Sequence, residues 1–400
     1  MITNNRALRI AHISDTHLGY RALFRIDPVT QRNQRSLDIE RAFEEAVSDI
    51  LSRNVDLVIH SGDVFHHTRP SWPALRCFIR QTRRLEDAGL PIIVLGGNHD
   101  TPRLRTSGSA YSVLDLALPR TTFVTGYEME SPELPDDMNL HVVAVPHGKL
   151  ADPIPPVVES REGKRNVLVT HGLVPGMQMR GHREPGEEEI SDALLDAQFD
   201  YIALGHYHVS GKQRHNAWYA GSTERMGFGD EDVDPGYLIV QLGGPGDPPE
   251  VEHIPVPARP MKTLPELNAE SLDAHEIADK VLTALEKLNS PQAVARISVA
   301  KAPRPIRREA ESILRRESVE LVWHLLVVSP GENPFEFAER EGELEHLDIR
   351  SLFGTFVKER TERGDYDLRF ANAFQTRGER ALDEALRAAE AMSATEDSAA

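Results

Sequence analysis

Residues 92–100 read Ile-Ile-Val-Leu-Gly-Gly-Asn-His-Asp, a run of apolar β-formers that ends abruptly in chemically active side chains. The two glycines allow the backbone to turn sharply and to approach a bound group closely. An amide, an imidazole and a carboxylate follow at Asn98, His99 and Asp100. By itself the segment also suits an ordinary surface turn, because Asn, Asp and Gly all favour turns.

The same transition from apolar to polar residues occurs at four further places. The apolar runs at 8–13, 55–59, 167–169 and 201–204 lead, in this order, to Asp15 and His17, to Asp63, to His171, and to His206 and His208. In open α/β sheets, ligands gather outside the carboxyl ends of the strands. The repetition therefore favours a single site at one edge of a sheet over a set of unrelated turns.

Composition limits the possible classes of protein. Four hundred residues with 40% apolar content suffice for one large domain and one or two smaller ones. The net charge of −18 argues against gripping nucleic acid with the whole surface, although a local basic path is still possible. Cys77 is the single cysteine and lies in a predicted helix, so we expect a packed side chain in a reducing, cytoplasmic environment. No apolar run approaches the ~20 residues needed to span a bilayer, so we expect no membrane partner.

The first part of the chain alternates predicted strands with amphipathic helices. Residues 37–51 and 73–85 have helical spacing of apolar positions, which predicts β-α-β units and an α/β fold. After Pro119 the pattern changes to short strands at 122–125 and 140–145. A second sheet packed on the first is the simplest interpretation. Residues 218–222 and 236–240 would then be late strands of the same domain.

A segment rich in proline and glycine, residues 243–260, excludes a helix or a central strand and predicts a domain boundary. Beyond it we expect a small α+β unit, with helices at 271–288 and 307–315 and strands at 293–299 and 319–328. Two amphipathic helices at 348–359 and 368–391 and a polar tail complete the chain. The predicted domains are 1–258, 259–334 and 335–392, followed by a disordered tail at 393–400.

The polar residues at the strand ends have the chemistry of metal ligands. They are Asp15, His17, Asp63, Asn98, His171, His206 and His208. Oxygen and imidazole donors without a thiolate suit manganese, iron, zinc or magnesium. Seven ligands are too many for one ion, but they suffice for two ions about 3.5–4 Å apart if one carboxylate bridges them. Such a pair clamps the attacking and leaving oxygens at phosphorus, so the sequence predicts phosphoester hydrolysis.

These motifs, Asp-x-His, Gly-Asp, Gly-Asn-His-Asp, a lone His and Gly-His-x-His in this order, resemble the calcineurin-like metallophosphoesterases over about residues 8–242. The resemblance implies a four-layer α/β/β/α sandwich. Residues 14–20, 62–66 and 220–225 further resemble the DNA double-strand-break repair nucleases of the SbcD and meiotic recombination eleven type. By this resemblance, the unit after residue 258 of this chain would correspond to the capping domain of those nucleases.

The family resemblance also implies individual roles. One Mn²⁺ would be held by Asp15, His17, Asp63 and His208, and a second Mn²⁺ by Asp63, Asn98, His171 and His206, with Asp63 bridging. Mg²⁺, Fe²⁺ or Zn²⁺ are alternatives. His99 would stabilise the transition state and protonate the leaving oxygen, which suits a side chain that titrates near neutral pH.

Five further histidines near the motifs have other expected roles. His66 would orient the substrate phosphate, whereas His67, one position away, is expected to be a solvated neighbour. His12, His60 and His147 fall inside strand patterns, and we expect them to be packed or to support the ligands.

Arginines after the motifs are candidates for phosphate contacts, because a guanidinium can clasp a phosphate with two hydrogen bonds. The DNA-binding candidates are Arg21, Arg25, Arg103, Arg105, Arg180 and Arg183, with Arg32, Arg35 and Arg214 nearby in the same loops. A solvated loop is the alternative interpretation. The acidic runs 187–189 and 230–232 are expected to repel DNA from other faces. Nothing resembles a base-reading motif, so we expect recognition of the DNA backbone and ends.

The resemblance implies 3'-to-5' exonuclease activity on duplex DNA, endonuclease activity on single strands and a role in double-strand-break repair. It also implies a homodimer built through helices of the nuclease domain, a coiled-coil ABC-type ATPase partner of the SbcC kind, and association with the nucleoid through DNA. The alternatives are a phosphodiesterase for small substrates and a non-catalytic scaffold on the same fold. The apolar stripes of the C-terminal helices either fold back on the chain or dock on the ATPase.

Overall fold

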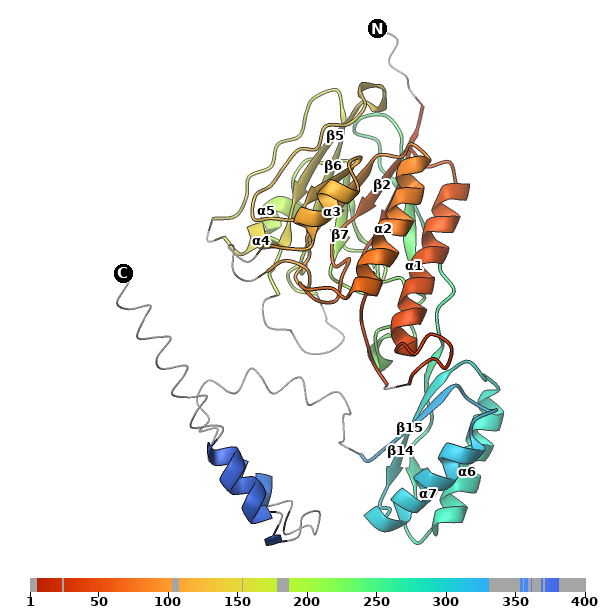
Figure 1. Cartoon of the computed structure of the whole chain (residues 1–400). Coiled ribbons are helices and arrows are strands. Elements are labelled where there is room, and N and C mark those ends of the chain that lie inside the picture. The colour runs from red at the N-terminus through yellow and green to blue at the C-terminus, as the bar shows by residue number, and fades with distance from the viewer. Residues whose placement is uncertain are drawn as a thin grey trace. The chain divides into compact units, whose positions relative to one another are not determined.

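The computed structural model describes residues 6–23, 25–102, 108–152, 154–177 and 187–330, together with 353–354, 356–358, 361, 368–369 and 371–380. It has two compact units, residues 1–330 and residues 331–400. Figure 1 shows the strands and helices of the first unit, which contains every predicted metal ligand.

The first sheet has six strands in the order β11-β10-β1-β2-β3-β4. Strands β1 (Leu8–Ile13), β2 (Leu57–His60), β3 (Ile92–Leu95) and β4 (Thr121–Val124) are parallel, and β10 (Gly236–Leu242) pairs with β1 in the antiparallel direction. The edge strand β11 (Glu250–Pro255) lies within the proline-rich segment in which the sequence pattern excluded a helix or a central strand. An edge strand tolerates prolines because only one side of it must supply hydrogen bonds.

The second sheet has five strands in the order β5-β6-β7-β9-β8. Strands β5 (Leu140–Val145), β6 (Arg165–His171), β7 (Tyr201–Gly205) and β9 (Ala217–Tyr219) are parallel, and β8 (Gly211–Lys212) is antiparallel to β9. Short helices α4 (His147–Leu150) and α5 (Asp192–Leu195) connect these strands.

Alternation along the strands explains how the two sheets pack. Successive side chains of a strand point to opposite faces. One apolar cluster joins the inner faces of both sheets, with Ile10, Leu57, Ile59, Ile93 and Leu95 from the first and Val142, Ala144, Val167, Val169 and Ala203 from the second. The intervening residues belong to two other clusters on the outer faces. The predicted second sheet, packed on the first, is confirmed.

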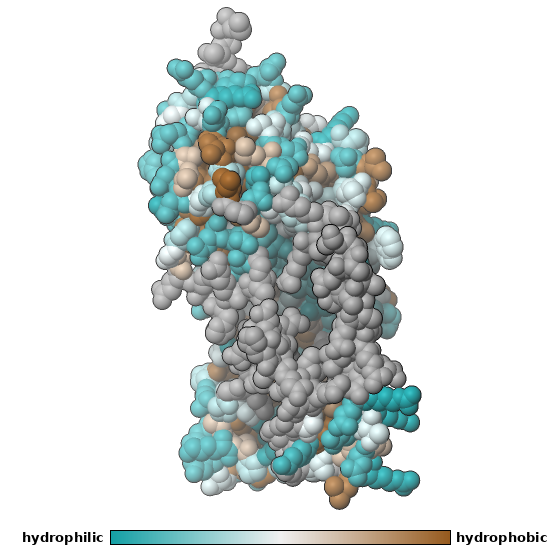
Figure 2. All heavy atoms as spheres, turned by 90° about the vertical axis from the view of Figure 1, so that its left-hand side faces the viewer, coloured by the Kyte–Doolittle hydropathy of each residue, from teal (hydrophilic) through white to brown (hydrophobic). Residues whose placement is uncertain are grey.

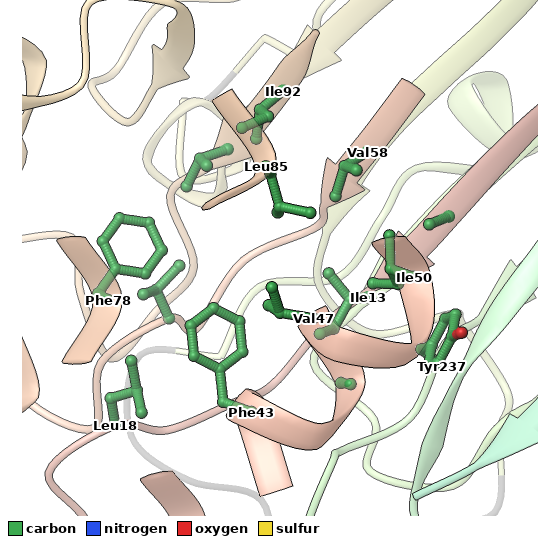
Figure 3. Close-up of a cluster of buried hydrophobic side chains, with 14 of the residues drawn as sticks. Ile13, Leu18, Phe43, Val47, Ile50, Val58, Phe78, Leu85, Ile92 and Tyr237 are labelled. Carbon is green, nitrogen blue, oxygen red and sulfur yellow. The ribbon is translucent and has the colours of Figure 1, made fainter. Parts of the chain in front are cut away.

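Helices α1 (Gln34–Ser52) and α2 (Trp72–Asp87) cover the outer face of the first sheet and lie side by side in Figure 1. In Figure 3, Phe43 of α1 and Phe78 of α2 lie in one buried cluster with Ile13 and Val58 of the sheet. Burying each such side chain contributes about 1.5–3 kcal/mol. Together with the clusters on the second sheet, this packing gives the predicted α/β/β/α layers.

Both helices extend beyond the predicted ranges, and local chemistry explains their starts. The Asn33 side chain accepts a hydrogen bond from Ser36 N and caps α1, and Pro73 lies in the first turn of α2. Cys77 is buried in α2, and burial raises the pKa of its thiol to about 12. A thiol with that pKa is not a nucleophile near neutral pH.

Residues 261–328 form a third sheet with two helices, which we call the small sheet unit. It contains β12 (Met261–Thr263), β13 (Leu267–Asn268), β14 (Val294–Ala300), β15 (His324–Val328), α6 (Ala274–Leu288) and α7 (Arg304–Glu317). The prediction that a strand begins at Val319 is wrong, because Leu321 and Val322 donate their amide hydrogens to Ser318 O in a turn after α7. Whether this unit is a separate capping domain stays a prediction.

The second compact unit is described only in part. Residues 371–380 are helical, and the Phe353 and Phe374 rings lie 5.5 Å apart, so two of the predicted apolar residues pack on one another. Most of the predicted helix at 348–359, the end of the one at 368–391 and the tail at 393–400 lie outside the described residues.

The surface agrees with the high charge of the chain. On the face that Figure 2 shows, hydrophilic residues predominate and hydrophobic residues occur in small groups. Within the part of the chain that the structure describes, no helix combines the length and the apolar character needed to cross a membrane.

Candidate metal and catalytic site

The carboxyl ends of five parallel strands bring the predicted ligands together. Asp15 and His17 follow β1, Asp63 follows β2 and Asn98 follows β3. His171 is the last residue of β6, and His206 and His208 follow β7. Because both sheets contribute, the site lies where the strand ends of the two sheets meet.

Backbone conformation at four of these residues is unusual. Asp15, His17, Asp63 and His206 have φ angles of 51°, 43°, 55° and 108°. Only a few per cent of non-glycine residues adopt positive φ, and such residues concentrate at functional sites. The loops are therefore shaped to direct these side chains rather than for local stability alone.

Glycines beside the ligands make room for them. A Cβ on Gly97 would collide with the Asp63 carboxylate, and a Cβ on Gly62 would collide with the His171 ring. At Gly205 a Cβ would collide with Ser61 O. These glycines permit a close approach of backbone and ligand side chains that no other residue would allow.

Two groups of donor atoms at the site consist wholly of predicted ligands, and a third joins His17 to His66 and His99. Donor atoms of Asp15, His17 and His208 all lie within 4.8 Å of one another, and so do those of Asp63, His171 and His206. Within the first group, Nε2 of His17 lies 3.1 Å from Nε2 of His208.

Asn98 and Asp63 complete the arrangement. Asn98 Oδ1 lies 2.9 Å from His171 Nε2 and 3.0 Å from His206 Nδ1, which places Asn98 in the second group. Asp63 Oδ2 lies 3.4 Å from His171 Nε2 and 3.7 Å from His17 Nε2. Asp63 therefore stands between the two groups, where a bridging carboxylate is needed.

The electrostatics of the site favour bound positive charge. Burial lowers the pKa of His171, but the charge and hydrogen bond of Asp63, together with Asp15 and the Ser61 carbonyl, raise that pKa to about 9. Buried carboxylates without bulk water nearby attract cations strongly. The donor set and the field thus both fit divalent metal ions.

Asp100 anchors the loop that carries Asn98 and His99. Its carboxylate accepts hydrogen bonds from Gly97 N and Val64 N, both at 2.7 Å, and from the Tyr111 hydroxyl at 2.6 Å. Burial, with the nearby Asp63, raises the pKa of Asp100 to about 6. Asp100 therefore joins the loop after β3 to the loop after β2.

The two predicted catalytic histidines lie at the mouth of the ligand groups. The His99 and His66 rings stack with centroids 5.0 Å apart, and the His17 ring meets His99 edge-on at 4.8 Å. His99 Nδ1 lies 3.2 Å from His66 O, so this nitrogen donates to a carbonyl and the ring orientation is defined. His67 is exposed beside His66.

The remaining motif histidines are placed behind the ligands. His12 and His60 are buried in β1 and β2, and burial lowers the pKa of each to about 3. His147 is not in a strand as predicted but begins α4, and its Nδ1 lies 3.2 Å from His171 O.

The sequence patterns did not predict two carboxylates that lie at the site. Glu187 Oε1 lies 3.3 Å from His206 Nε2, and Asp230 Oδ2 lies 3.6 Å from His208 Nδ1. Their acidic runs were predicted to repel DNA from other faces, which is wrong for these two residues. A glutamate or aspartate inside an acidic run is expected to be solvated. No local sequence signal distinguishes the one acidic residue that faces the site from its solvated neighbours.

The arginine candidates divide into three sets. Arg103, Arg105, Arg180 and Arg183 lie outside the described residues. Arg21 is exposed, and the Arg25 guanidinium lies 4.5 Å from the centre of the Trp323 ring. The others are engaged elsewhere: Arg35 is buried against Asp38, Arg32 pairs with Glu40, and Arg214 pairs with Asp192 at the amino end of β9.

A two-sheet sandwich with two metal-ligand groups at its strand ends defines a metallophosphoesterase. In agreement, the family model described as calcineurin-like phosphoesterase matches residues 8–210. The chain belongs to this family of phosphoesterases.

Several curated relatives carry the name DNA double-strand break repair protein Mre11. The protein from Haloferax volcanii is 34% identical over 243 residues, which are 58% of this chain and 49% of that protein. The one from Thermoplasma acidophilum is 31% identical over 221 residues, covering 53% and 55% of the two chains. The one from Methanococcus maripaludis is 26% identical over 265 residues, covering 63% and 68%. The chain thus spans about half the length of the first two relatives.

Proposed function

We propose that this protein is a manganese-dependent DNA nuclease that processes DNA ends in double-strand-break repair. The observation that carries the proposal is the pair of donor groups with the Asp63 carboxylate between them and with His99 and His66 beside them. The names of the relatives support DNA as the substrate. The proposed activities are 3'-to-5' exonuclease on duplex DNA and endonuclease on single strands.

Two divalent cations, one in each ligand group, would supply Lewis-acid polarisation of the phosphate oxygens. In the chain itself, Asp63 would hold both groups at a fixed separation. His66 would orient the phosphate, and His99 would give a proton to the leaving oxygen. The hydrogen bond from His99 Nδ1 to His66 O leaves Nε2 as the nitrogen for that proton transfer.

Cleavage assays distinguish the candidate functions. The purified protein with Mn²⁺ would be given linear duplex DNA, hairpin DNA and bis-p-nitrophenyl phosphate, with and without EDTA. Metal-dependent cleavage of the DNA substrates supports the proposal. Activity confined to the small phosphodiester indicates a small-substrate phosphodiesterase, and bound metal without any hydrolysis indicates a scaffold.

We also propose a homodimer formed through helices of the nuclease domain. Its support is apolar exposure on α2 and on α3 (Tyr111–Ala117): Trp72 of α2 is 84% exposed, and Leu116 and Val113 of α3 are 82% and 67% exposed. Large apolar side chains at such exposure mark candidate contact surfaces.

The first prediction tests this surface. The double substitution Val113→Asp and Leu116→Asp is expected to shift the protein from dimer to monomer, because buried unpaired carboxylates would oppose association. Sedimentation of the full chain measures the mass. The control is Val29→Asp, an 87% exposed residue outside α2 and α3, which should leave the mass unchanged. A dimeric double variant would contradict the proposed surface.

We further propose that the C-terminal helices dock on a coiled-coil ABC-type ATPase. Residues 259–400 carry 20 basic and 27 acidic side chains, a net charge of −7, which suits a protein contact better than a DNA contact. The apolar spacing of these helices fits helix-in-groove binding.

The second prediction concerns a chain shortened to end at Pro334. It should keep metal-dependent hydrolysis of bis-p-nitrophenyl phosphate, because every proposed ligand precedes residue 210. It should fail to co-purify with an SbcC-like ATPase that retains the full chain. Unfolding of the shortened chain would indicate that the helices are structural, and undiminished ATPase binding would contradict docking.

A further inference from the structure

Helix η3 (Phe228–Asp230) places a carboxylate behind one of the proposed ligands. Asp230 Oδ2 lies 3.6 Å from His208 Nδ1 and accepts a hydrogen bond from Met226 N at 2.9 Å. The opposite ring nitrogen, His208 Nε2, lies 3.1 Å from Nε2 of His17. The His208 ring thus faces a carboxylate on one side and the first ligand group on the other.

Metal-binding histidines commonly give their second ring N–H to a carboxylate or a carbonyl, which sets the tautomer and the ring orientation. Two of the other three predicted ligand histidines have such partners. His171 Nδ1 lies 2.8 Å from Ser61 O, and His206 Nε2 lies 3.3 Å from Glu187 Oε1. Asp230 is therefore the corresponding partner of His208.

Asp230 differs from these partners because its segment is held by the small sheet unit. The Arg296 guanidinium lies 4.4 Å from the centre of the Phe228 ring, at the start of η3. At its other end, Glu231 Oε2 accepts a hydrogen bond from Thr263 Oγ1 at 2.5 Å. Arg296 also donates to Thr263 Oγ1 at 2.9 Å, so β12 and β14 hold both ends of η3 together.

We propose that Asp230 is a positioning residue that orients His208 for a divalent cation, and that the small sheet unit controls this orientation through η3. The inference rests on the proposed binding of one cation at Asp15, His17 and His208. It implies that residues of β12 and β14, which contribute no ligand, set the affinity of that group for its cation.

Titration of the full-length protein with Mn²⁺, followed by calorimetry, tests the proposal without an activity assay. Asp230→Asn should weaken one of the two sites by about 10- to 100-fold and leave the other unchanged. Asp232→Asn, an exposed residue two positions on, removes the same charge and should change neither site. Glu187→Gln should instead weaken Mn²⁺ binding at the site that contains His206.

Arg296→Ala tests the link to the small sheet unit without altering any residue near the ligands. Loss of the contact with Phe228 should weaken the same site as Asp230→Asn, by about two- to fivefold. Thermal unfolding in EDTA should give all variants a transition like that of the unchanged protein. This measurement separates lost positioning from lost folding.

The outcomes are distinguishable. If the unchanged protein binds no Mn²⁺, the proposed function fails, and with it the inference. If that protein binds two ions and Asp230→Asn keeps both affinities, or if Asp232→Asn has the same effect as Asp230→Asn, the positioning role is wrong. Unchanged affinity in Arg296→Ala would overturn the control by the small sheet unit.

Discussion

The Asp63→Ala variant is expected to lose both bound cations and to hydrolyse its substrate about 10³-fold more slowly, or slower still. The carboxylate lies between the ligand groups, with Oδ2 3.4 Å from His171 Nε2 and 3.7 Å from His17 Nε2, so its removal leaves each group without a shared anionic ligand. Metal ions contribute several kcal/mol of charge stabilisation in such sites, which corresponds to at least three powers of ten in rate.

Metal analysis after gel filtration, combined with the rate on bis-p-nitrophenyl phosphate, measures this effect. Asp137→Ala is the matched control, because Asp137 is an exposed aspartate on η2 (Asp136–Met138). It should bind the same number of ions as the unchanged protein. Full metal occupancy and activity in the Asp63→Ala variant would mean that Asp63 does not bridge the two cations.

His99→Ala should separate chemistry from metal binding. The substitution removes the proposed proton donor, so turnover should fall by about 10²-fold or more. Metal content should stay the same, because the His99 backbone N–H, which donates to Asp63 Oδ1 at 2.9 Å, is retained in alanine. DNA affinity should also be preserved.

Single-turnover cleavage of duplex DNA, DNA binding and metal content would be measured on the same preparation. His67→Ala serves as the control, because this imidazole is exposed beside the site. Its removal should leave the cleavage rate almost unchanged. Loss of metal in His99→Ala would count against a catalytic role. An unchanged cleavage rate would also count against it, because water or another side chain would then donate the proton to the leaving oxygen.

The sequence could single out the predicted ligand positions because each lies where a buried apolar strand ends and a polar loop begins. An apolar strand must be buried, and the residues after it are the first that can reach a site at the sheet edge. Asp15, Asp63 and Asn98 all follow this rule. Parallel pairing then brings positions far apart in the chain to the same edge.

Other features depend on contacts that have no local signature. Glu187 and Asp230 each meet a histidine about twenty residues away, and nothing in an acidic run marks the residue that turns inward. Arg35 resembled a solvated rim arginine, yet it is buried against Asp38 and Glu224. Strand β11 was hidden because prolines exclude a central strand but not an edge strand.

Trp323 makes the junction between the sandwich and the small sheet unit optically visible. Two guanidinium groups lie over its ring, those of Arg25 at 4.5 Å and Arg259 at 4.1 Å from the ring centre. The chain has three tryptophans, and the other two, Trp72 and Trp218, lie in α2 and β9. With these two replaced by phenylalanine, fluorescence emission would come from Trp323 alone. The protein thus carries a spectroscopic reporter of the contact between the sandwich and the small sheet unit, which requires no attached dye.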